Sequence, residues 1–180
     1  MMRIVITGTP GTGKTRIARL LAKRTGWPLV EIKEFVNANK LFKKEKGTKA
    51  VDVAALGKRL RPALARSRDY IVEGHLACEV RIPADFVFVL RTHPEKLRAR
   101  LAKRRYAKKK LDENLEAEML DYCVQRVLKE YRAEPLELDT TRRSVPQCAA
   151  EILRAIKHKK KKLDSVDYSG ELKKHLRLRT

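Results

Sequence analysis

Gly8-Thr-Pro-Gly-Thr-Gly-Lys-Thr15 is the stretch that decides how this chain folds. It matches the phosphate-binding pattern G-x-x-x-x-G-K-[ST] at all four fixed positions. The apolar run Ile4-Val-Ile6 before it is typical of a buried strand, and Ile17, Leu20 and Leu21 after it recur at helical spacing. The pattern binds phosphate in this strand–loop–helix context, so we interpret it as a P-loop rather than a Gly-rich turn that binds nothing.

The residue types in this loop predict a nucleotide phosphate as the ligand. Its glycines let the backbone fold around an anion with the N–H groups pointing inward, and the helix N-terminus adds a positive dipole end. Lys14 would reach the β- and γ-phosphates, and the Thr15 hydroxyl would ligate Mg²⁺. We therefore expect ATP with Mg²⁺ as the cofactor.

Apolar strands alternate with helical patterns along the chain. Strands are expected at residues 3–7, 28–31, 70–73, 86–90 and 136–139. Such alternation predicts a three-layer α/β fold of the P-loop NTPase type, with a five-stranded parallel sheet flanked by helices. The run 86–90 is the most apolar and is placed centrally, and ligands are expected at the carboxyl ends of the strands.

Several helix boundaries also carry sequence signals. Gly26 is expected to end the first helix, and Ser144 with Gln147 resembles a capping box. Asp112 is interpreted as the N-cap of one long helix. Residues 33–50 are polar, Lys-rich and poorly periodic. The apolar stripe expected on the long helix is Leu115, Met119, Tyr122, Cys123 and Val127.

The chain is strongly basic, with 43 Lys and Arg against 22 Asp and Glu and a formal net charge of +21. This excess favours a polyanionic partner, most simply RNA, over a charge-rich surface adapted to heat, in which Glu would balance the bases. Residues 157–180 hold nine Lys/Arg and three Asp/Glu and are interpreted as a basic tail after a core at residues 1–156. Such a tail either binds nucleic acid or is merely solvated.

Other features bound the class of protein. No stretch approaches the roughly 20 apolar residues of a membrane span, and the N-terminus enters a strand without a signal peptide. The three widely spaced cysteines, Cys78, Cys123 and Cys148, fit neither a zinc nor a disulfide framework and are interpreted as small buried hydrophobes. We therefore expect a cytoplasmic protein with no membrane partner.

A second candidate site follows the third predicted strand, at Val72-Glu-Gly-His75. P-loop enzymes place a second Mg²⁺-holding carboxylate, usually Asp, at the end of such a strand. Glu73 would serve here, directly or through a water, because Mg²⁺ keeps several waters. His75 would face the phosphates; the alternative is a structural loop histidine.

A third candidate site is the basic segment from Arg91 to Lys110, which holds ten Lys/Arg and one acid. Arg100 and Arg104 lie four residues apart and share a helix face. Arginine stabilises the charge of a phosphoryl group in transfer, so these two are candidate catalytic residues. The alternative is a solvated basic helix.

These stretches together resemble the adenylate kinase isoenzyme 6 family, also called the coilin-interacting nuclear ATPase protein (CINAP) family. These are small P-loop nucleoside monophosphate kinases that also act in small ribosomal subunit assembly. The matching stretches are Ile6–Thr15, Ile71–His75, Phe88–Thr92 with Leu97 and Arg100-Leu101, and Arg104–Tyr106 with Lys109, Glu113-Asn114 and Glu118.

The resemblance implies roles for particular residues. Gly11, Gly13, Lys14, Thr15 and Arg16 would bind ATP. Glu73 and His75 would stand at the family's Asp-x-His site, which is tied to Mg²⁺ and ATP turnover. Residues near 101–111 would form the lid, with Arg104 reaching the ATP phosphates, and residues near 31–54 the monophosphate-binding region. The implied partners are AMP or another nucleoside monophosphate, the small-subunit ribosomal protein uS11 and rRNA.

The chain departs from the family pattern at three places. Glu73 replaces the usual Asp, and Arg105 replaces a lid glycine that would act as a hinge. Asn37 aligns roughly with the position where family members often carry an Arg for the AMP phosphate. The lysines that could substitute there as less directional charges are Lys33, Lys40, Lys43 and Lys44.

Three functional hypotheses therefore remain open from the sequence. The first is a nucleoside monophosphate kinase that converts ATP and AMP into two ADP. The second is an ATP-hydrolysing ribosome assembly factor in which AMP phosphorylation is secondary. The third is a small-metabolite kinase that uses the same P-loop.

Overall fold

A five-stranded parallel sheet forms the centre of the molecule. The computed structural model describes residues 1–45, 48–104 and 106–177. The strands lie in the order β2-β5-β1-β6-β7, which confirms the predicted P-loop NTPase architecture. β6 lies inside the sheet, next to the middle strand β1. The bounds are β1 (Arg3–Gly8), β2 (Leu29–Glu31), β5 (Tyr70–Glu73), β6 (Phe86–Arg91) and β7 (Leu136–Asp139).

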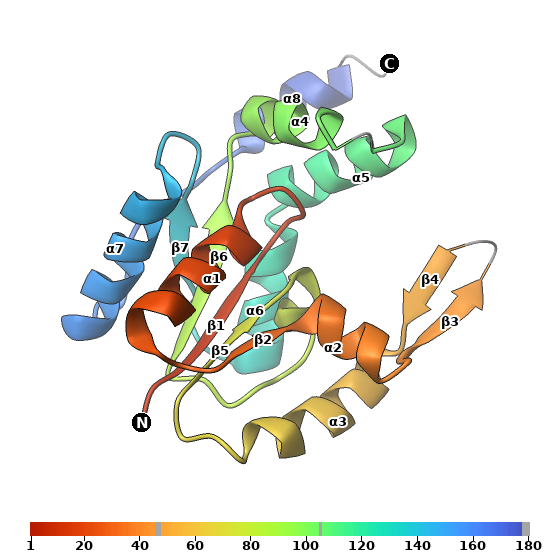
Figure 1. The fold of residues 1–180 in the computed structure, drawn as a ribbon. Helices are drawn as coiled ribbons and strands as arrows, with labels where there is room; N and C mark the ends of the chain where they lie inside the picture. Colours follow the sequence, from red (N-terminus) through yellow and green to blue (C-terminus); the bar gives the residue numbers. More distant parts are fainter. Residues whose placement is uncertain (46–47, 105, 178–180) are drawn as a thin grey trace.

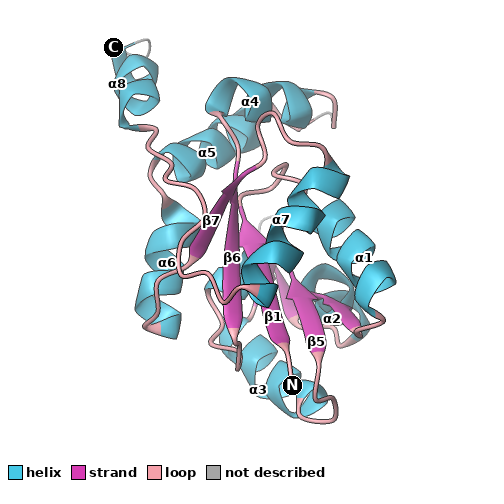
Figure 2. Cartoon of the chain, turned by 90° about the vertical axis from the view of Figure 1, so that its left-hand side faces the viewer, coloured by secondary structure: helices cyan, strands magenta, loops and turns pink. Residues whose placement is uncertain are grey.

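Helices cover both faces of the sheet and give the fold its three layers (Figures 1 and 2). One face is covered by α1 (Lys14–Thr25) and α7 (Val145–Lys157), whose buried side chains share a core with Ile4, Ile6 and Phe88. The other face is covered by α2 (Ile32–Ala38), α3 (Val53–Leu64) and α6 (Tyr122–Tyr131). Within the described residues, no helix combines the length and the apolar composition that crossing a membrane requires.

Local signals set two of these helix ends as predicted. Gly26 ends α1 in the left-handed conformation, with φ at 73°, and its N–H donates to the Ala22 carbonyl. At α7, Ser144 and Gln147 form the predicted capping box, in which each side chain bonds to the other's backbone N–H.

A third group of helices lies beyond the carboxyl ends of the strands, at the top of Figure 1. It contains α4 (Pro94–Ala102), α5 (Lys108–Met119) and α8 (Ser169–Arg177). Leu97, Leu101 and Leu115 from α4 and α5 form a separate small core together with Tyr168, which precedes α8. The predicted lid, residues 101–111, joins α4 to α5; Arg105 in that segment lies outside the described residues.

The prediction of one long helix capped by Asp112 is wrong. The helix α5 begins at Lys108 with Ala107 at its N-cap, and Asp112 lies inside it. The chain then breaks at Asp121, which has φ at 53°, before α6 begins. At this break, the Asp121 carboxylate accepts a hydrogen bond from the buried Arg91 guanidinium.

Residues 33–50 hold more structure than their composition indicates. They contain most of α2 and an antiparallel hairpin of β3 (Phe42–Glu45) and β4 (Thr48–Val51). Residues 46–47, at the tip, lie outside the described part of the chain, as do 178–180 at the C-terminus.

Much of the predicted basic tail packs against the rest of the molecule. Tyr168 is buried, with its ring 5.2 Å from the Arg91 guanidinium carbon. Asp164 pairs with Arg143, and α8 packs against α5. Tyr168, Asp164 and α8 are therefore packed rather than merely solvated, whereas Lys159–Lys162 are exposed; the division at residue 156 stays a prediction.

Candidate active site

The P-loop connects β1 to α1 at the edge of the sheet where the parallel strands end. Gly11 has φ at 99°, and a Cβ atom there would lie only 2.7 Å from Leu97 Cδ1, so this position requires glycine. Gly13 precedes α1, and no side chain in the described residues caps that helix start. The backbone N–H groups in the first turn of α1 are therefore free to bind an anion.

Lys14 lies in the concave side of this loop. Its ammonium donates to the Thr9 carbonyl over 3.1 Å, and the residue is 8% exposed. Burial lowers the pKa of Lys14, although the negative charge of nearby groups such as Glu73 opposes this shift. A phosphate beside Lys14 would supply the counter-charge that the buried ammonium lacks, which agrees with its predicted role.

Thr15 and Glu73 meet across the site as the sequence predicted for a Mg²⁺ pair. The Thr15 hydroxyl donates to Glu73 Oε1 over 3.1 Å, and Glu73 ends β5, next to β1 in the sheet. Burial raises the pKa of Glu73, and Lys14 and the Thr15 hydroxyl oppose this shift. A hydroxyl and a carboxylate oxygen are hard donors of the type that Mg²⁺ prefers, so the residues present fit this ion.

The turn after Glu73 depends on a second glycine. A Cβ atom on Gly74 would lie 2.8 Å from Ile32 Cβ, so no other residue fits against α2 there. The chain then enters the 3-10 turn η1 (His75–Cys78), which brings His75 to the P-loop.

His75 contacts the first residue of the P-loop. Its Nδ1 lies 3.2 Å from the Gly8 carbonyl oxygen, and its ring stacks on Tyr122 with the centroids 5.9 Å apart. Burial, and then the charge of Lys14, lower the pKa of His75. A carbonyl oxygen only accepts, so this neutral imidazole carries its proton on Nδ1 and leaves Nε2 as an acceptor.

Two cavities meet over the P-loop and form one cleft. The larger, about 530 Å³, lies between the P-loop, α4 and the segment that connects β7 to α7. The smaller, about 330 Å³, lies between the P-loop, the start of α2 and the turn after β5. Both are lined by Gly11, Gly13, Arg16 and Arg104. The cleft therefore offers one compartment on each side of the phosphate loop.

The two predicted catalytic arginines, Arg100 and Arg104, occupy different places. Arg104 borders both compartments, as a residue that contacts a transferred phosphate would. Arg100 instead donates to the backbone carbonyls of Gly11, over 3.4 Å, and Thr140, over 2.9 Å. Its guanidinium thus ties the P-loop to the end of β7, which is the geometry of a positioning residue; its catalytic role stays a prediction.

Two other residues of the cleft, Arg19 and Thr140, were not found from the sequence, whereas Lys33 was among the lysines proposed for the monophosphate. Arg19 and Lys33 line the smaller compartment, and Arg19 pairs with Glu31 through two hydrogen bonds, of 2.6 and 2.9 Å. Thr140 lines the larger one and donates to the Thr12 carbonyl over 3.0 Å. The position of Arg19, one helical turn after Thr15, is the one signal that could have identified it.

Comparisons with known proteins identify the family of this chain. Residues 4–121 match a family model described as an AAA domain. A protein of Methanocaldococcus jannaschii named "Putative adenylate kinase" is 37% identical over 180 residues, which cover 98% of each chain. A protein of the same name from Thermococcus onnurineus is 38% identical over 174 residues, which cover 96% of this chain and 94% of the relative.

The match to the first relative extends into the C-terminal segment, because it covers 98% of this chain. Among solved structures, shikimate kinase from Acinetobacter baumannii in complex with shikimate superimposes with a TM-score of 0.63 at 14% identity. That alignment covers 89% of this chain and 96% of the kinase. At this identity, the likeness shows the fold alone.

Proposed function

This chain belongs to the family of P-loop nucleoside monophosphate kinases, and we propose that it transfers the γ-phosphoryl group of ATP to AMP, giving two ADP. The observation that carries the proposal is the two-sided cleft over the P-loop, with Arg104 bordering both compartments. A donor nucleotide and an acceptor on opposite sides of one phosphate loop can react in line.

The larger compartment suits the nucleoside of ATP. It extends from the P-loop along α4 to the segment after β7, and Arg104 borders it near the phosphates. The smaller compartment suits the acceptor phosphate, because Arg19 and Lys33 belong to five cations that line it against three carboxylates, so positive charge remains although Glu31 pairs with Arg19. The Arg expected by family resemblance near Asn37 is absent, so these two cations support binding of the monophosphate in its place.

In this proposal the protein contributes positioning and charge rather than covalent chemistry. The N–H groups at the start of α1 and Lys14 bind the β- and γ-phosphates, and Arg104 stabilises charge on the transferred group. Thr15 and Glu73 would hold Mg²⁺, which neutralises phosphate charge when it is bound. Arg100 keeps the P-loop in place through the Gly11 carbonyl, and closure of residues 101–111 would exclude water.

Separation of nucleotides by chromatography tests the proposal. Purified protein receives Mg-ATP alone, and then Mg-ATP with each nucleoside monophosphate in turn. Formation of ADP that requires AMP supports the kinase. Slow formation of ADP that is indifferent to every monophosphate would overturn it.

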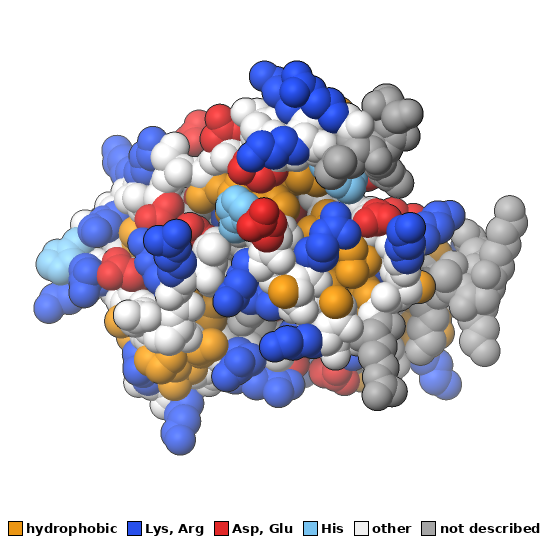
Figure 3. Space-filling model, turned by 90° about the horizontal axis from the view of Figure 1, so that it is seen from above, with side chains coloured by type: hydrophobic (Ala, Val, Ile, Leu, Met, Phe, Trp, Pro, Cys, Tyr) orange, Lys and Arg blue, Asp and Glu red, His pale blue; other side chains and the backbone are white. Residues whose placement is uncertain are grey.

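A second candidate function is an ATP-hydrolysing ribosome assembly factor, as in the adenylate kinase isoenzyme 6 family that the sequence resembles. Its partners would be rRNA and the ribosomal protein uS11, and its compartment the cytoplasm. The net charge of +21 favours this function, as does the exposed run Lys159–Lys162. On the face over α4, α5 and α8, in contrast, Lys and Arg are interspersed with Asp and Glu (Figure 3).

Replacement of the four residues Lys159–Lys162 by Gln tests the RNA contact better than deletion of residues 157–180, which would also remove the buried Tyr168. If these lysines contact RNA phosphates, the slope of log affinity against log salt for single-stranded RNA falls by up to about 3. An unchanged slope would contradict the role of this run in RNA binding, whatever the outcome of the kinase assay.

A further inference from the structure

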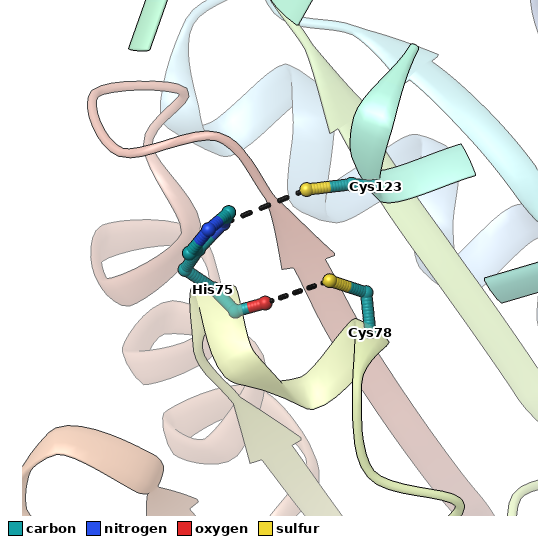
Figure 4. Close-up of side chains that lie close together, drawn as sticks. All are labelled: His75, Cys78 and Cys123. Atoms are coloured by element: carbon teal, nitrogen blue, oxygen red, sulfur yellow. Dashed lines mark hydrogen bonds between the residues drawn. The ribbon is translucent and has the colours of Figure 1, made fainter. Parts of the chain in front are cut away.

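Three side chains that can coordinate a soft cation lie together behind the P-loop. One imidazole nitrogen of His75 and the sulfur atoms of Cys78 and Cys123 all lie within 4.8 Å of one another, and His75 Nδ1 is the nitrogen in contact with Cys123. His75 and Cys78 come from η1 and Cys123 comes from α6. The Cys123 thiol points toward the His75 imidazole, and the Cys78 thiol donates to the His75 backbone carbonyl over 3.0 Å (Figure 4). We propose that this cluster, His75–Cys78–Cys123, is a binding site for a thiophilic divalent cation of the Zn²⁺ class.

The donor atoms suit such an ion. Zinc is bound by thiolate sulfur at about 2.3 Å and by imidazole nitrogen at about 2.0–2.1 Å, and sets of two Cys and one His occur with the fourth position left open. Around a tetrahedral ion at these distances, neighbouring donor atoms lie roughly 3.4–3.8 Å apart. Cys123 Sγ already lies 3.5 Å from His75 Nδ1, and all three donor atoms lie within 4.8 Å of one another, so the remaining pairs need to approach by at most about 1 Å.

The charges in and around the cluster favour a divalent ion bound by two thiolates. Two thiolates and a neutral imidazole cancel its charge, because metal binding releases the thiol protons. This balance matters because the ammonium of Lys14 lies near Cys123 and would repel an uncompensated cation. Mg²⁺ is a poor occupant of the same three atoms, since it takes oxygen donors. The cluster is therefore chemically distinct from the Thr15–Glu73 pair.

Burial and outer contacts hold the cluster in place. Cys78 is 0% and Cys123 4% exposed, whereas His75 is partly exposed and lines the smaller compartment of the cleft. The cleft is thus a route of entry past the imidazole. Tyr122 stacks on that imidazole, and its hydroxyl donates to Glu79 over 2.6 Å. These two contacts hold the imidazole in its orientation.

An ion bound to the cluster would affect the P-loop through His75 Nδ1, the atom that contacts the Gly8 carbonyl. His75 Nδ1 now donates to the Gly8 carbonyl over 3.2 Å, and an ion bound at Nδ1 replaces that proton. The loss of this hydrogen bond loosens the first residue of the phosphate loop. We therefore expect the bound ion to slow phosphoryl transfer; only this consequence rests on the proposed function, and binding of the ion does not.

Titration of the reduced, metal-free protein with Co²⁺ tests the site, because cobalt reports thiolate ligands by a sulfur-to-metal charge-transfer absorption. We expect one equivalent per chain to give this band, and Cys78→Ser or Cys123→Ser to weaken binding by at least about 100-fold. The matched control is Cys148→Ser, since Cys148 is a buried thiol in the core on the opposite face of the sheet. That control keeps the band.

The site is overturned if wild-type protein gives no band at one to ten equivalents, or if the band survives both cysteine substitutions. If a variant does not fold, the site is tested on the native wild-type chain by comparing the rates of cysteine alkylation with and without Zn²⁺. Slower labelling of Cys78 and Cys123 with zinc, at unchanged labelling of Cys148, supports the site. Equal labelling, or a disulfide between the two cysteines in place of a metal complex, contradicts it.

Discussion

Replacement of Arg91 by Met is expected to be one of the most damaging single changes in this protein. Arg91 is 2% exposed at the end of β6 and donates to the carboxylates of Glu118, Asp121 and Glu137. It also donates to the Glu118 carbonyl over 3.0 Å. These contacts join β6 and β7 to the junction of α5 and α6, so the guanidinium connects the sheet to the helices above it.

The magnitude follows from what the substitution leaves behind. Glu118 is also 2% exposed, and without Arg91 its carboxylate keeps the Thr92 backbone N–H, at 2.9 Å, as a donor but loses its counter-charge. Removal of one partner of a buried ion pair costs about 3–5 kcal/mol. For a chain of this size, each kcal/mol lowers the melting temperature by about 2–4 °C, so the expected decrease is roughly 6–20 °C.

Thermal unfolding followed by circular dichroism measures the effect, with Arg154→Met as the matched control. Arg154 also pairs with a glutamate, over 2.7 Å to Glu151, but its side chain is 55% exposed, and such pairs contribute at most about 1 kcal/mol. In the double variant Arg91→Met with Glu118→Gln, the buried charge is gone and part of the stability returns. A melting temperature of Arg91→Met within 2 °C of wild type, or a double variant no more stable than the single one, would refute this reasoning.

Three further predictions concern the loop and the C-terminal segment. Lys14→Ala should abolish phosphoryl transfer in the chromatographic assay, because the variant lacks the buried ammonium that faces the phosphate loop; retained turnover would contradict the P-loop assignment. Arg100→Ala should lower the free energy of unfolding by about 1.5–3 kcal/mol, which is the contribution of one hydrogen bond from a charged group. It should also weaken ATP binding measured by calorimetry, and Arg100→Lys should restore little of either property. Asp164 should make stability depend on pH in the acid range. Burial alone would raise the pKa of this carboxyl, but the Arg143 guanidinium and the Asp139 backbone N–H together outweigh burial and hold the pKa below 3.8. Its stabilising contribution is therefore complete above pH 3.8 and is lost as pH falls through the lower folded-state pKa, so wild type and Asp164→Asn should converge in melting temperature under acid; a difference that persists there would show that the ion pair is not the cause.

The parts of the fold that could be predicted are those fixed by local signals. The strand before the P-loop, the glycine that ends α1 and the capping box of α7 all depend on residues within one turn of each other. The pairing of Thr15 with Glu73 also followed, because the carboxyl ends of neighbouring parallel strands meet at one edge of the sheet.

The parts that could not be predicted depend on distant partners. The apolar stripe runs unbroken from Leu115 to Val127, so nothing local marks the break at Asp121, where the contact partner is Arg91 from another strand. Arg100 looks like a free lid arginine in the sequence because its acceptors are carbonyls in two remote loops. Tyr168 stands in a basic segment and is buried only because the small core over α4 and α5 receives it.

The fate of the γ-phosphoryl group tests the central claim most directly. ATP labelled in the γ-phosphate is mixed with the protein, Mg²⁺ and AMP, and the products are separated within a single turnover. A kinase with an acceptor in the smaller compartment delivers the label to ADP, and Lys14→Ala delivers none. Label that appears only as inorganic phosphate, at a rate unaffected by AMP, would contradict the kinase and leave ATP hydrolysis as the activity of this cleft.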